Sequence, residues 1–422
     1  MSVGVVGLGY VGLPLAVAFA EAGVDVVGID VDSDRVARLN AGSSPVEDIS
    51  DERLAAVADR FSFSVDYDAV SSSEAVIICV PTPLSNKREP DLSYLLGAAE
   101  QLAAVLTAGQ LIALESTTYP GTTREQLVPI LERSGLEAGT DFNVAFSPER
   151  IDPGRTDFTV ETTPKVVGGL TPACTDRAAT LYEQVTTEVV RVGTPEVAEL
   201  TKLLENIFRS VNIALVNELA QLCDRMSIDV WEVVDAAATK PFGFMRFEPG
   251  PGMGGHCLPV DPFYLSFKAR EHDFYTEFIE LAGKTNQAQP AWCAQKVGEA
   301  LNTVGMAVRG ARVCVLRVSY KAGVGDMRES PALKIIEHLR AAGAEVSYFD
   351  PHVPRLESQG LTSLAQPPGD DDCDCACIVT AHADVDYEAL VAGGTLVVDF
   401  RGVTRHLDAE NVVLLGRGDR RP

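Results

Sequence analysis

The chain has 422 residues, of which 46% are hydrophobic and 23% are charged, so it can form two or three globular domains. A formal net charge of −25 argues against nucleic acid and anionic membrane surfaces as partners, because both would repel the chain. Nine cysteines at irregular spacings suggest no disulfide framework and favour a reducing, cytoplasmic compartment.

The first 20 residues carry no charged side chain, as in a signal peptide or a membrane span. They contain no basic segment, since the first Lys or Arg is Arg35, and glycines together with Pro14 interrupt the run. No other stretch approaches the length of a membrane span, about 18 apolar residues, so no transmembrane helix is expected.

A glycine-rich turn separates the first expected strand from the first expected helix. Gly7, Gly9 and Gly12 form the pattern G-x-G-x-x-G, which lets backbone N–H groups and a helix N-terminus approach a pyrophosphate. Asp30 ends the second expected strand, where an acid accepts hydrogen bonds from ribose hydroxyl groups and repels a 2′-phosphate. The predicted cofactor is therefore NAD rather than NADP. Arg35 is either a contact on the adenine side or a solvated helix residue.

Strands and helices then alternate along the N-terminal half. The apolar runs 75–80 and 110–116 are typical of buried strands, and the periodic segments 91–106 and 122–135 are typical of helices. This alternation predicts a parallel, doubly wound sheet and the α/β fold class.

A different pattern begins near residue 194. Apolar residues recur at helical spacing from Val197 to Leu215, and the helix is expected to run unbroken to about Met226. A helix of this length with an extensive apolar stripe joins domains, forms a dimer interface or is buried in a core.

After residue 300 the alternation returns in a second, smaller α/β unit. Cys373, Cys375 and Cys377 alternate along one expected strand, which puts all three on one face. They are interpreted as small buried side chains, and no metal is predicted, because zinc-site spacings are absent. The acidic segment 366–372 is expected to be a surface loop.

The segment PGPGMGGHCLPVDPFYL, residues 249–265, is the most informative for chemistry. Glycines and prolines before Cys257 predict a close backbone approach, and Asp261 follows shortly after. Lys202 and Asn206 share one face of the long helix at the i, i+4 spacing. If the loop packs on that helix, a cation there would lower the thiol pKa and stabilise an oxyanion, whereas a purely buried cysteine would be inert.

Segments spread nearly end to end along the chain are similar to the UDP-glucose/GDP-mannose dehydrogenase family. The resemblance implies two Rossmann-like, doubly wound parallel-sheet domains joined by a long central helix, in a homodimer. It assigns an NAD-binding domain to 1–193, a dimerisation and catalytic-cysteine region to 194–300 and a UDP-sugar-binding domain to 301–422. The segments are GLGYVGLP (7–14), CVPTPL (79–84), ESTTYPGTT (115–123), SPER (147–150), TKLLENIFRSVNIALVNE (201–218), GGHCLPVDP (254–262) and GDMRESP (325–331).

Within this family, the loop P-G-P-G-x-G-G-H-C resembles the UDP-N-acetylhexosamine 6-dehydrogenase branch. The implied activity is oxidation of UDP-N-acetylglucosamine at C6 to the uronate, for polysaccharide biosynthesis, with UDP-N-acetylmannosamine or UDP-glucose as alternative substrates. A two-electron dehydrogenase of the 6-phosphogluconate or β-hydroxyacid type would not need the cysteine loop. A non-catalytic NAD- or sugar-nucleotide-binding regulator would tend to have lost the catalytic residues, which are all present here.

The resemblance implies a role for each matching residue in the oxidation. A water held by Asp261 takes the proton of the sugar alcohol, while Lys202 and Asn206 stabilise the developing oxygen charge. Cys257 then attacks the aldehyde to give a thiohemiacetal, and a second oxidation gives a thioester.

The same resemblance assigns hydrolysis of the thioester to a water that Glu149 and Thr118 position or activate. On the residues alone, Glu149 beside Arg150 is equally a salt bridge, and Thr118 is a turn residue or an NAD contact. The implied ligand contacts are, for NAD, Gly7, Gly9, Tyr10, Val11, Gly12, Asp30, Arg35, Pro81, Thr82, Thr118 and Arg328, and, for the sugar nucleotide, Glu149, Arg150, Lys202, Asn206, Gly254, Lys321 and Arg401.

Two positions depart from the family pattern. Arg317 stands where the family usually has a small residue, and it either crowds its strand or adds a cation near the UDP pocket. Pro153 stands where UDP-glucose dehydrogenases commonly carry a second glutamate, so the proton accounting of hydrolysis is expected to differ from theirs. Arg246 is a further candidate for phosphate binding, although it lies outside the segments that match the family.

Overall fold

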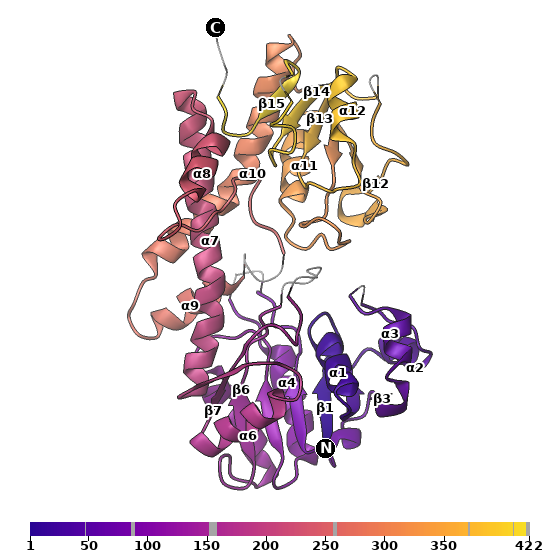
Figure 1. Cartoon of the computed structure of the whole chain (residues 1–422), viewed down its shortest axis with the longest axis vertical. Coiled ribbons are helices and arrows are strands. Elements are labelled where there is room, and N and C mark those ends of the chain that lie inside the picture. The colour runs from indigo at the N-terminus through magenta and orange to yellow at the C-terminus, as the bar shows by residue number, and fades with distance from the viewer. Residues whose placement is uncertain are drawn as a thin grey trace. The chain divides into compact units, whose positions relative to one another are not determined.

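The structure is a computed structural model that describes residues 1–46, 48–85, 89–151, 158–255, 260–369, 372–407 and 409–418. The chain divides into two compact units, and many of their helices and strands are labelled in Figure 1. The first unit comprises Met1–Glu205 and Phe263–Tyr275, and the second comprises Asn206–Pro262 and Thr276–Pro422. Each unit has a parallel sheet of its own.

The first unit contains an eight-stranded sheet with the order β3-β2-β1-β4-β5-β6-β7-β8. All neighbouring strands are parallel except β6 and β7, which are antiparallel. The first six strands have the order of a doubly wound nucleotide-binding sheet, which confirms the predicted fold class. The strands are β1 (Ser2–Val6), β2 (Asp25–Ile29), β3 (Phe61–Ser64), β4 (Ala75–Ile78), β5 (Leu111–Leu114), β6 (Asn143–Phe146), β7 (Lys165–Gly169) and β8 (Val189–Val192).

Buried apolar side chains account for the central strands of this sheet. Every residue of β4 (AVII) and of β5 (LIAL) is buried, as expected for parallel strands that helices cover on both faces. The segment 122–135, predicted as one helix, is divided into a π-helical turn (Thr123–Leu127), α5 (Val128–Leu131) and a short 3₁₀ turn (Glu132–Ser134). The other helices are α1 (Gly12–Glu21), α2 (Ser33–Asn40), α3 (Asp51–Ala55), α4 (Ser93–Val105) and α6 (Pro172–Tyr182).

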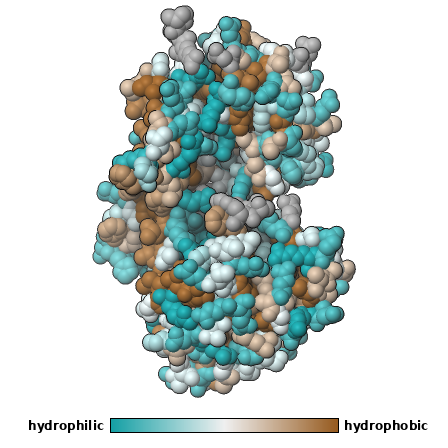
Figure 2. All heavy atoms as spheres, in the orientation of Figure 1, coloured by the Kyte–Doolittle hydropathy of each residue, from teal (hydrophilic) through white to brown (hydrophobic). Residues whose placement is uncertain are grey.

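The long helix predicted from about residue 194 to Met226 is confirmed as α7 (Pro195–Met226), which has 32 residues. It begins in the first unit and ends in the second. No helix in the described ranges, α7 included, is long and apolar enough to cross a membrane. Large apolar side chains nevertheless stay exposed along α7 at helical spacings, and Figure 2 shows hydrophobic residues gathered along it. They are Val197, Leu200, Leu204, Phe208, Leu215, Leu219, Leu222 and Met226.

The second unit contains a five-stranded parallel sheet with the order β10-β9-β13-β14-β15. Its two faces form separate apolar cores, one shared with α10 (Glu277–Thr303) and α11 (Pro331–Ala341), the other with α12 (Tyr387–Ala392). The chain passes from this unit back into the first along α9 (Asp261–Arg270). The remaining elements are α8 (Val230–Ala238), β9 (Arg312–Leu316), β10 (Glu345–Phe349), β13 (Cys375–Ile378), β14 (Leu396–Asp399), β15 (Val412–Leu414) and the antiparallel pair β11 (Arg355–Leu356) and β12 (Leu361–Thr362).

The three alternating cysteines at positions 373, 375 and 377 are buried, but they do not share one face. Cys375 and Cys377 belong to β13 and pack in the core with α10 and α11. Cys373 precedes the strand and packs in the opposite core, so the prediction of a single face is wrong for this residue. Among the residues that the structure describes, no three His, Cys, Asp or Glu side chains are grouped so that they could hold a metal ion.

Candidate active site

The predicted glycine turn connects β1 to α1. Gly7 has a φ of +92°, and a Cβ atom there would lie 2.6 Å from the main-chain oxygen of Cys79. At Gly12, a Cβ atom would lie 1.8 Å from the main-chain oxygen of Gly7. At Gly9, by contrast, no described atom lies within 4 Å of that position. Glycine is therefore required at 7 and 12 to close the turn, and the turn is open at Gly9, where a pyrophosphate can approach the N-terminus of α1.

Asp30 follows β2 and fastens it to the glycine turn. Its Oδ2 accepts hydrogen bonds from the Leu8 N–H and from Nη1 of Arg35, both at 2.9 Å. Its Oδ1 accepts one from the Asp32 N–H at 3.0 Å and keeps a lone pair for a ribose hydroxyl group. Arg35, predicted on the adenine side, thus contacts Asp30 directly. The turn and this carboxylate fit a dinucleotide with free ribose hydroxyl groups, as in NAD.

The other predicted cofactor contacts in this unit lie in turns that follow its strands. Tyr10 and Val11 occupy the turn before α1, and the Tyr10 side chain is exposed. Pro81 and Thr82 follow β4. Oγ1 of Thr82 donates to a main-chain oxygen in the loop after β5 at 2.7 Å, and the Tyr264 hydroxyl of α9 donates to the Thr82 main-chain oxygen at 2.7 Å. These bonds hold the loop after β4 in one position relative to its neighbours.

A buried cluster of charges lies where β5 and β6 end and β7 begins. Glu115 follows β5, Glu149 follows β6, and Lys165 is the first residue of β7. Because β7 runs antiparallel to β6, its first residue lies at the carboxyl end of the parallel strands. The Lys165 Nζ lies 2.7 Å from Oε2 of Glu115 and 3.2 Å from Oε2 of Glu149, and the three side chains are 6%, 0% and 13% exposed.

The cluster changes the proton affinity of its members. Burial raises the pKa of Glu149, but Lys165 and the main-chain donors outweigh burial, so this pKa lies below its ordinary value. Burial also raises the pKa of Glu115, and there Lys165 does not fully compensate. Burial lowers the pKa of Lys165, yet the two carboxylates outweigh it and raise this pKa above its ordinary value. Glu149 is therefore held as a carboxylate beside a lysine that stays charged.

Three further predicted residues lie in the first unit. Nζ of Lys202 donates a hydrogen bond to the main-chain oxygen of Glu149. Arg150 donates to the Pro164 main-chain oxygen at 2.6 Å and pairs with Glu205 of α7 at 2.8 Å. The hydroxyl of Thr118 is buried and has no hydrogen-bond partner in the part of the chain that the structure describes. A buried hydroxyl in that state has a donor and an acceptor left for a ligand or a water.

A carboxylate that the sequence reasoning missed, Glu199 of α7, supports the loop after Thr118. It accepts hydrogen bonds from the Gly121 N–H at 2.7 Å, the Thr123 N–H at 2.8 Å and the Thr123 hydroxyl at 2.7 Å. Burial raises the pKa of Glu199 to about 7, although its hydrogen bonds oppose the rise. Glu115 and Lys165 were missed as well. The signal for Lys165 is a lysine heading an otherwise apolar strand, and Glu115 opens the segment ESTTYPGTT.

In the second unit, Asn206 and Asp261 are in direct contact. Nδ2 of Asn206 donates a hydrogen bond to Oδ2 of Asp261, which is the first residue of α9 and is 1% exposed. Asn206 lies one helical turn after Lys202 on α7. Cys257 and Pro153 lie outside the described residues.

The glycine segment that leads to Cys257 packs on the loop after β9. A Cβ atom at Gly254 would lie 2.6 Å from Cβ of Tyr320, and Gly255, with a φ of +87°, donates its N–H to the Arg328 main-chain oxygen at 3.0 Å. The close approach predicted from the glycines is therefore made to the loop that carries Lys321 and Arg328. The Arg328 guanidinium pairs with Asp326 at 2.6 Å.

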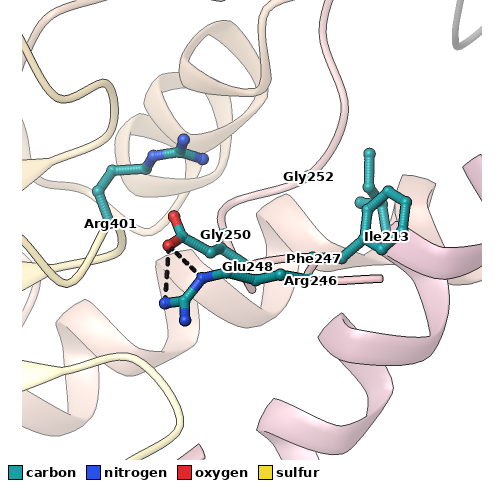
Figure 3. Close-up of a pocket in the computed structure, with 7 residues that line it drawn as sticks. All are labelled: Ile213, Arg246, Phe247, Glu248, Gly250, Gly252 and Arg401. Carbon is teal, nitrogen blue, oxygen red and sulfur yellow. Dashed lines mark hydrogen bonds and ion pairs between the residues drawn. The ribbon is translucent and has the colours of Figure 1, made fainter. Parts of the chain in front are cut away.

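A cavity of about 360 Å³ lies in the second unit (Figure 3). Nη1 of Arg246 pairs with Asp235 at 2.7 Å, and Nη2 pairs with Glu248 at 3.0 Å. The Arg401 guanidinium lies so close to Gly250 that a Cβ atom there would be 2.8 Å from its Nη1. Burial lowers the pKa of Arg401, which the Glu248 charge opposes. Two arginines on one cavity suit an anionic ligand. The cavity is lined by Ile213, Arg246, Phe247, Glu248, Gly250, Gly252 and Arg401.

Arg317, the departure noted in the sequence, is buried at the end of β9. It has a φ of +68°, and its side chain is 1% exposed. Its Nη2 lies 2.7 Å from Asp384, its Nη1 lies 3.5 Å from Asp350, and the guanidinium stacks on Phe349 at 5.0 Å from the ring centre. The added cation is therefore neutralised within its own unit.

Three domain profiles of one family match successive parts of the chain. The NAD binding domain of the UDP-glucose/GDP-mannose dehydrogenase family matches residues 1–186, its central domain matches 196–288, and its UDP binding domain matches 314–406.

Proteins similar to the chain include dehydrogenases of different sugar nucleotides. The UDP-N-acetyl-D-glucosamine 6-dehydrogenase of Pseudomonas aeruginosa is 37% identical over 87% of this chain and 87% of its own length. The UDP-N-acetyl-D-mannosamine dehydrogenase of Pyrococcus horikoshii is 36% identical over 99% of this chain and 100% of its own. A solved structure of the UDP-D-ManNAc dehydrogenase from Pyrococcus horikoshii has a TM-score of 0.89 at 34% identity, covering 99% of this chain and 100% of that one.

Proposed function

Because the chain belongs to the UDP-glucose/GDP-mannose dehydrogenase family, and is thus an NAD-dependent oxidoreductase acting on CH–OH groups, we propose that it oxidises C6 of UDP-N-acetylglucosamine to the uronate. The observation that carries the proposal is the buried pair formed by Asn206 of α7 and Asp261, the second of which follows Cys257 closely in the chain. An amide and a carboxylate in this arrangement can hold a water and accept a proton from it.

The choice of sugar rests on the loop before Cys257 and on the similarity to the Pseudomonas aeruginosa enzyme. UDP-N-acetylmannosamine is the second candidate. It is favoured by the Pyrococcus horikoshii relative, which matches over 99% of this chain.

The cavity with Arg246 and Arg401 supports a role in binding the anionic part of the sugar nucleotide. Arginine donates paired, charge-assisted hydrogen bonds to phosphate oxygens, and the partial burial of the site strengthens them. Lys321 is proposed as a further contact, since it belongs to the loop on which Gly254 and Gly255 pack. The overall charge of −25 makes such local cations necessary for an anionic substrate.

The first stage of the proposed reaction converts the C6 alcohol to an aldehyde. NAD, when bound, supplies the acceptor for each hydride that the sugar loses. Asp261, hydrogen-bonded to Asn206, holds a water that takes the hydroxyl proton. Lys202 stabilises the negative charge that develops on the oxygen. The residues at the glycine turn keep the dinucleotide in place through their main-chain N–H groups.

The second stage converts the aldehyde to a carboxylate. The Cys257 thiolate adds to the aldehyde carbon to give the oxyanion of a thiohemiacetal, and loss of a second hydride from this oxyanion gives a thioester. The water oxygen bonds to the thioester carbon, the C–S bond breaks, and the sulfur leaves as the thiolate. Glu149 takes the proton that the water loses, and the Thr118 hydroxyl, buried without a described partner, orients that water. The four electrons leave as two hydrides.

We also propose that the protein is a homodimer formed through α7. Its exposed apolar side chains are spaced to make one continuous face, which is costly to leave in water. A Leu204→Glu, Leu215→Glu double variant should sediment as a monomer at concentrations where the wild type sediments as a dimer. The control Leu364→Glu, at an exposed leucine in the loop after β12, should sediment as the wild type does. A wild-type monomer would refute this part of the proposal.

The substrate is tested by mixing the protein with NAD and, separately, UDP-N-acetylglucosamine, UDP-N-acetylmannosamine, UDP-glucose and GDP-mannose. We expect the largest kcat/KM with UDP-N-acetylglucosamine, measured from NADH absorbance. A larger value with UDP-N-acetylmannosamine would select the second candidate, and no NADH with any of the four would refute the proposed function.

A further inference from the structure

Both carboxylate oxygens of Glu149 have hydrogen-bond donors within the protein itself. Its Oε1 accepts the N–H groups of Arg150 at 2.7 Å and Ile151 at 2.6 Å, and its Oε2 faces Nζ of Lys165 at 3.2 Å. Lys202 bonds the main-chain oxygen of the same residue. A carboxylate with this many donors has little rotamer freedom, and its negative form is favoured over its neutral form.

Lys165 is itself held from behind by Glu115. Its Nζ lies closer to Glu115, at 2.7 Å, than to Glu149, and it also lies 3.5 Å from the Pro148 main-chain oxygen. Glu115 is fully buried, and its Oε1 has no hydrogen-bond partner among the described residues. An ion pair this deep stabilises a fold poorly compared with apolar side chains of the same size, because both charges lose their hydration. The presence of this pair is better explained by an effect on Glu149.

The charges around this cluster come from several packed elements. Besides Lys202, α7 contributes Glu205, which pairs with Arg150 at 2.8 Å. The titratable neighbours are Tyr182 of α6 and Cys79 after β4, whose pKa values burial and the Glu115 charge raise well above the ordinary ones. Both stay neutral in the working pH range, so the charge of the cluster is set by Glu115, Glu149 and the lysines.

We propose that Lys165 and Glu115 form a buried positioning pair that fixes the orientation and the negative charge of Glu149, so that Glu149 enters thioester hydrolysis as a proton acceptor. The inference rests on the proposed function and concerns its last step. In that step the water oxygen bonds to the thioester carbon, sulfur leaves as the Cys257 thiolate, Glu149 takes one proton, and the second proton of the water passes to solvent. Lys165 touches neither substrate nor water in this role, because it acts through Glu149.

The two members of the pair have opposite effects on Glu149, which gives the test its direction. Lys165→Met removes the neighbouring cation, so Glu149 should hold its proton more tightly, by about 1 pH unit or more. Glu115→Gln removes a like charge and leaves Lys165 to Glu149 alone, so the shift should have the opposite sign. Lys165→Arg keeps the cation and should preserve the wild-type behaviour more closely than Lys165→Met does.

The measurement is the decay of the covalent sugar adduct on Cys257, followed by rapid quenching and intact-protein mass spectrometry between pH 5 and pH 9. UDP-N-acetylglucosamine and NAD start the reaction. We expect the acidic limb of the decay rate to move to higher pH in Lys165→Met and to lower pH in Glu115→Gln, with a decay about 10-fold slower or more in Lys165→Met below pH 6. Lys334→Met is the matched control, since Lys334 forms an exposed pair with Glu337 at 2.9 Å in the second unit.

Lys165→Met leaves Glu115 buried without the cation that pairs with it, and circular dichroism will show whether the variant folds. If it does not, the Lys165→Met, Glu115→Met double variant removes the buried pair together and should still move the limb to higher pH. An unchanged limb in folded variants, or shifts of the same sign for both members, would overturn the inference while leaving the proposed function intact. Absence of NADH and of adduct in the wild type would overturn the proposed function, and the inference with it.

Discussion

The turn after β1 in the first sheet and the turn after β9 in the second have similar hydrogen bonds but contain different residues. After β1, Gly7 has a φ of +92° and donates its N–H to the Ile29 main-chain oxygen at 2.8 Å. After β9, Arg317 has a φ of +68° and donates its N–H to the Phe349 main-chain oxygen at 2.8 Å. The left-handed conformation is free for glycine and costs an arginine roughly 1–2 kcal/mol, so the second turn needs compensating contacts.

An aspartate after the neighbouring strand completes both turns. Asp30 accepts the Leu8 N–H at 2.9 Å, and Asp350 accepts the Val318 N–H at 2.9 Å. In the first unit the turn is left open at Gly9. In the second unit the Arg317 guanidinium pairs with acidic side chains of the same unit. The same hydrogen-bonded turn thus leaves room for a charged ligand after β1, where it contains glycine. After β9, where it contains arginine, the charge is neutralised by acidic side chains of the protein.

The open turn should fail most severely when a side chain is added at Gly12. Gly12→Ala places a Cβ atom where 1.8 Å separates it from a main-chain oxygen, so the turn must move and its N–H groups lose their aim at the pyrophosphate. We expect NADH binding, followed by fluorescence titration, to weaken about 100-fold or more. Gly97→Ala, at a helical position with open space around it, should bind NADH as the wild type does. Equal NADH affinities for Gly12→Ala and Gly97→Ala would show that the turn after β1 does not bind the cofactor.

Arg317→Gly gives the turn after β9 the glycine that the turn after β1 has, and it tests how much the ion pairs of Arg317 stabilise the second unit. The substitution relieves the positive φ, but it leaves Asp350 buried without its cation, which is the larger effect. We expect the free energy of unfolding in urea to fall by roughly 1–3 kcal/mol. Asp384→Asn, which removes the exposed partner of Arg317, should lower the free energy of unfolding by less than about 1 kcal/mol. A more stable Arg317→Gly protein would show that backbone strain, rather than the ion pair, dominates this turn.

Glu199 is a third carboxylate that accepts hydrogen bonds from main-chain donors, and it should make the stability of the protein depend on pH. Its folded-state pKa is raised to about 7 from an ordinary value of 4.5, so its stabilising contribution is complete below the ordinary value and is lost as the pH rises toward 7. The melting temperature of the wild type should therefore fall relative to that of Glu199→Gln between pH 5 and pH 7, by the equivalent of about 1–2 kcal/mol. Glu196→Gln, on the same helix but paired at the surface with Arg124, is the control. Parallel curves for wild type and Glu199→Gln would refute the shifted pKa.

Features with local signals could be predicted from the sequence. The glycine spacing and Asp30 predicted the turn at β1, and helical periodicity predicted α7 to within a residue or two of its ends. Other features depend on topology, which periodicity does not contain. Lys165 reaches Glu149 only because β7 runs antiparallel to β6, and the sequence carries no signal for that reversal.

Arg317 shows the same limit from another side. The sequence revealed a large residue at an unusual place, but its φ and its partners depend on where β10 and the loop after β13 end. Cys373 was assigned to the wrong face because the strand begins only at Cys375. In each case the residue type was informative, and its surroundings were set by segments distant in the chain.

The reaction proposed for this protein is a four-electron oxidation that passes through a covalent bond to Cys257. The most direct test counts the NADH formed per molecule of UDP-N-acetylglucosamine consumed, for the wild type and for Cys257→Ala. We expect two NADH per sugar with a uronate product in the wild type, and no turnover to uronate in the variant. One NADH per sugar with an aldehyde product, or turnover that does not depend on Cys257, would contradict it.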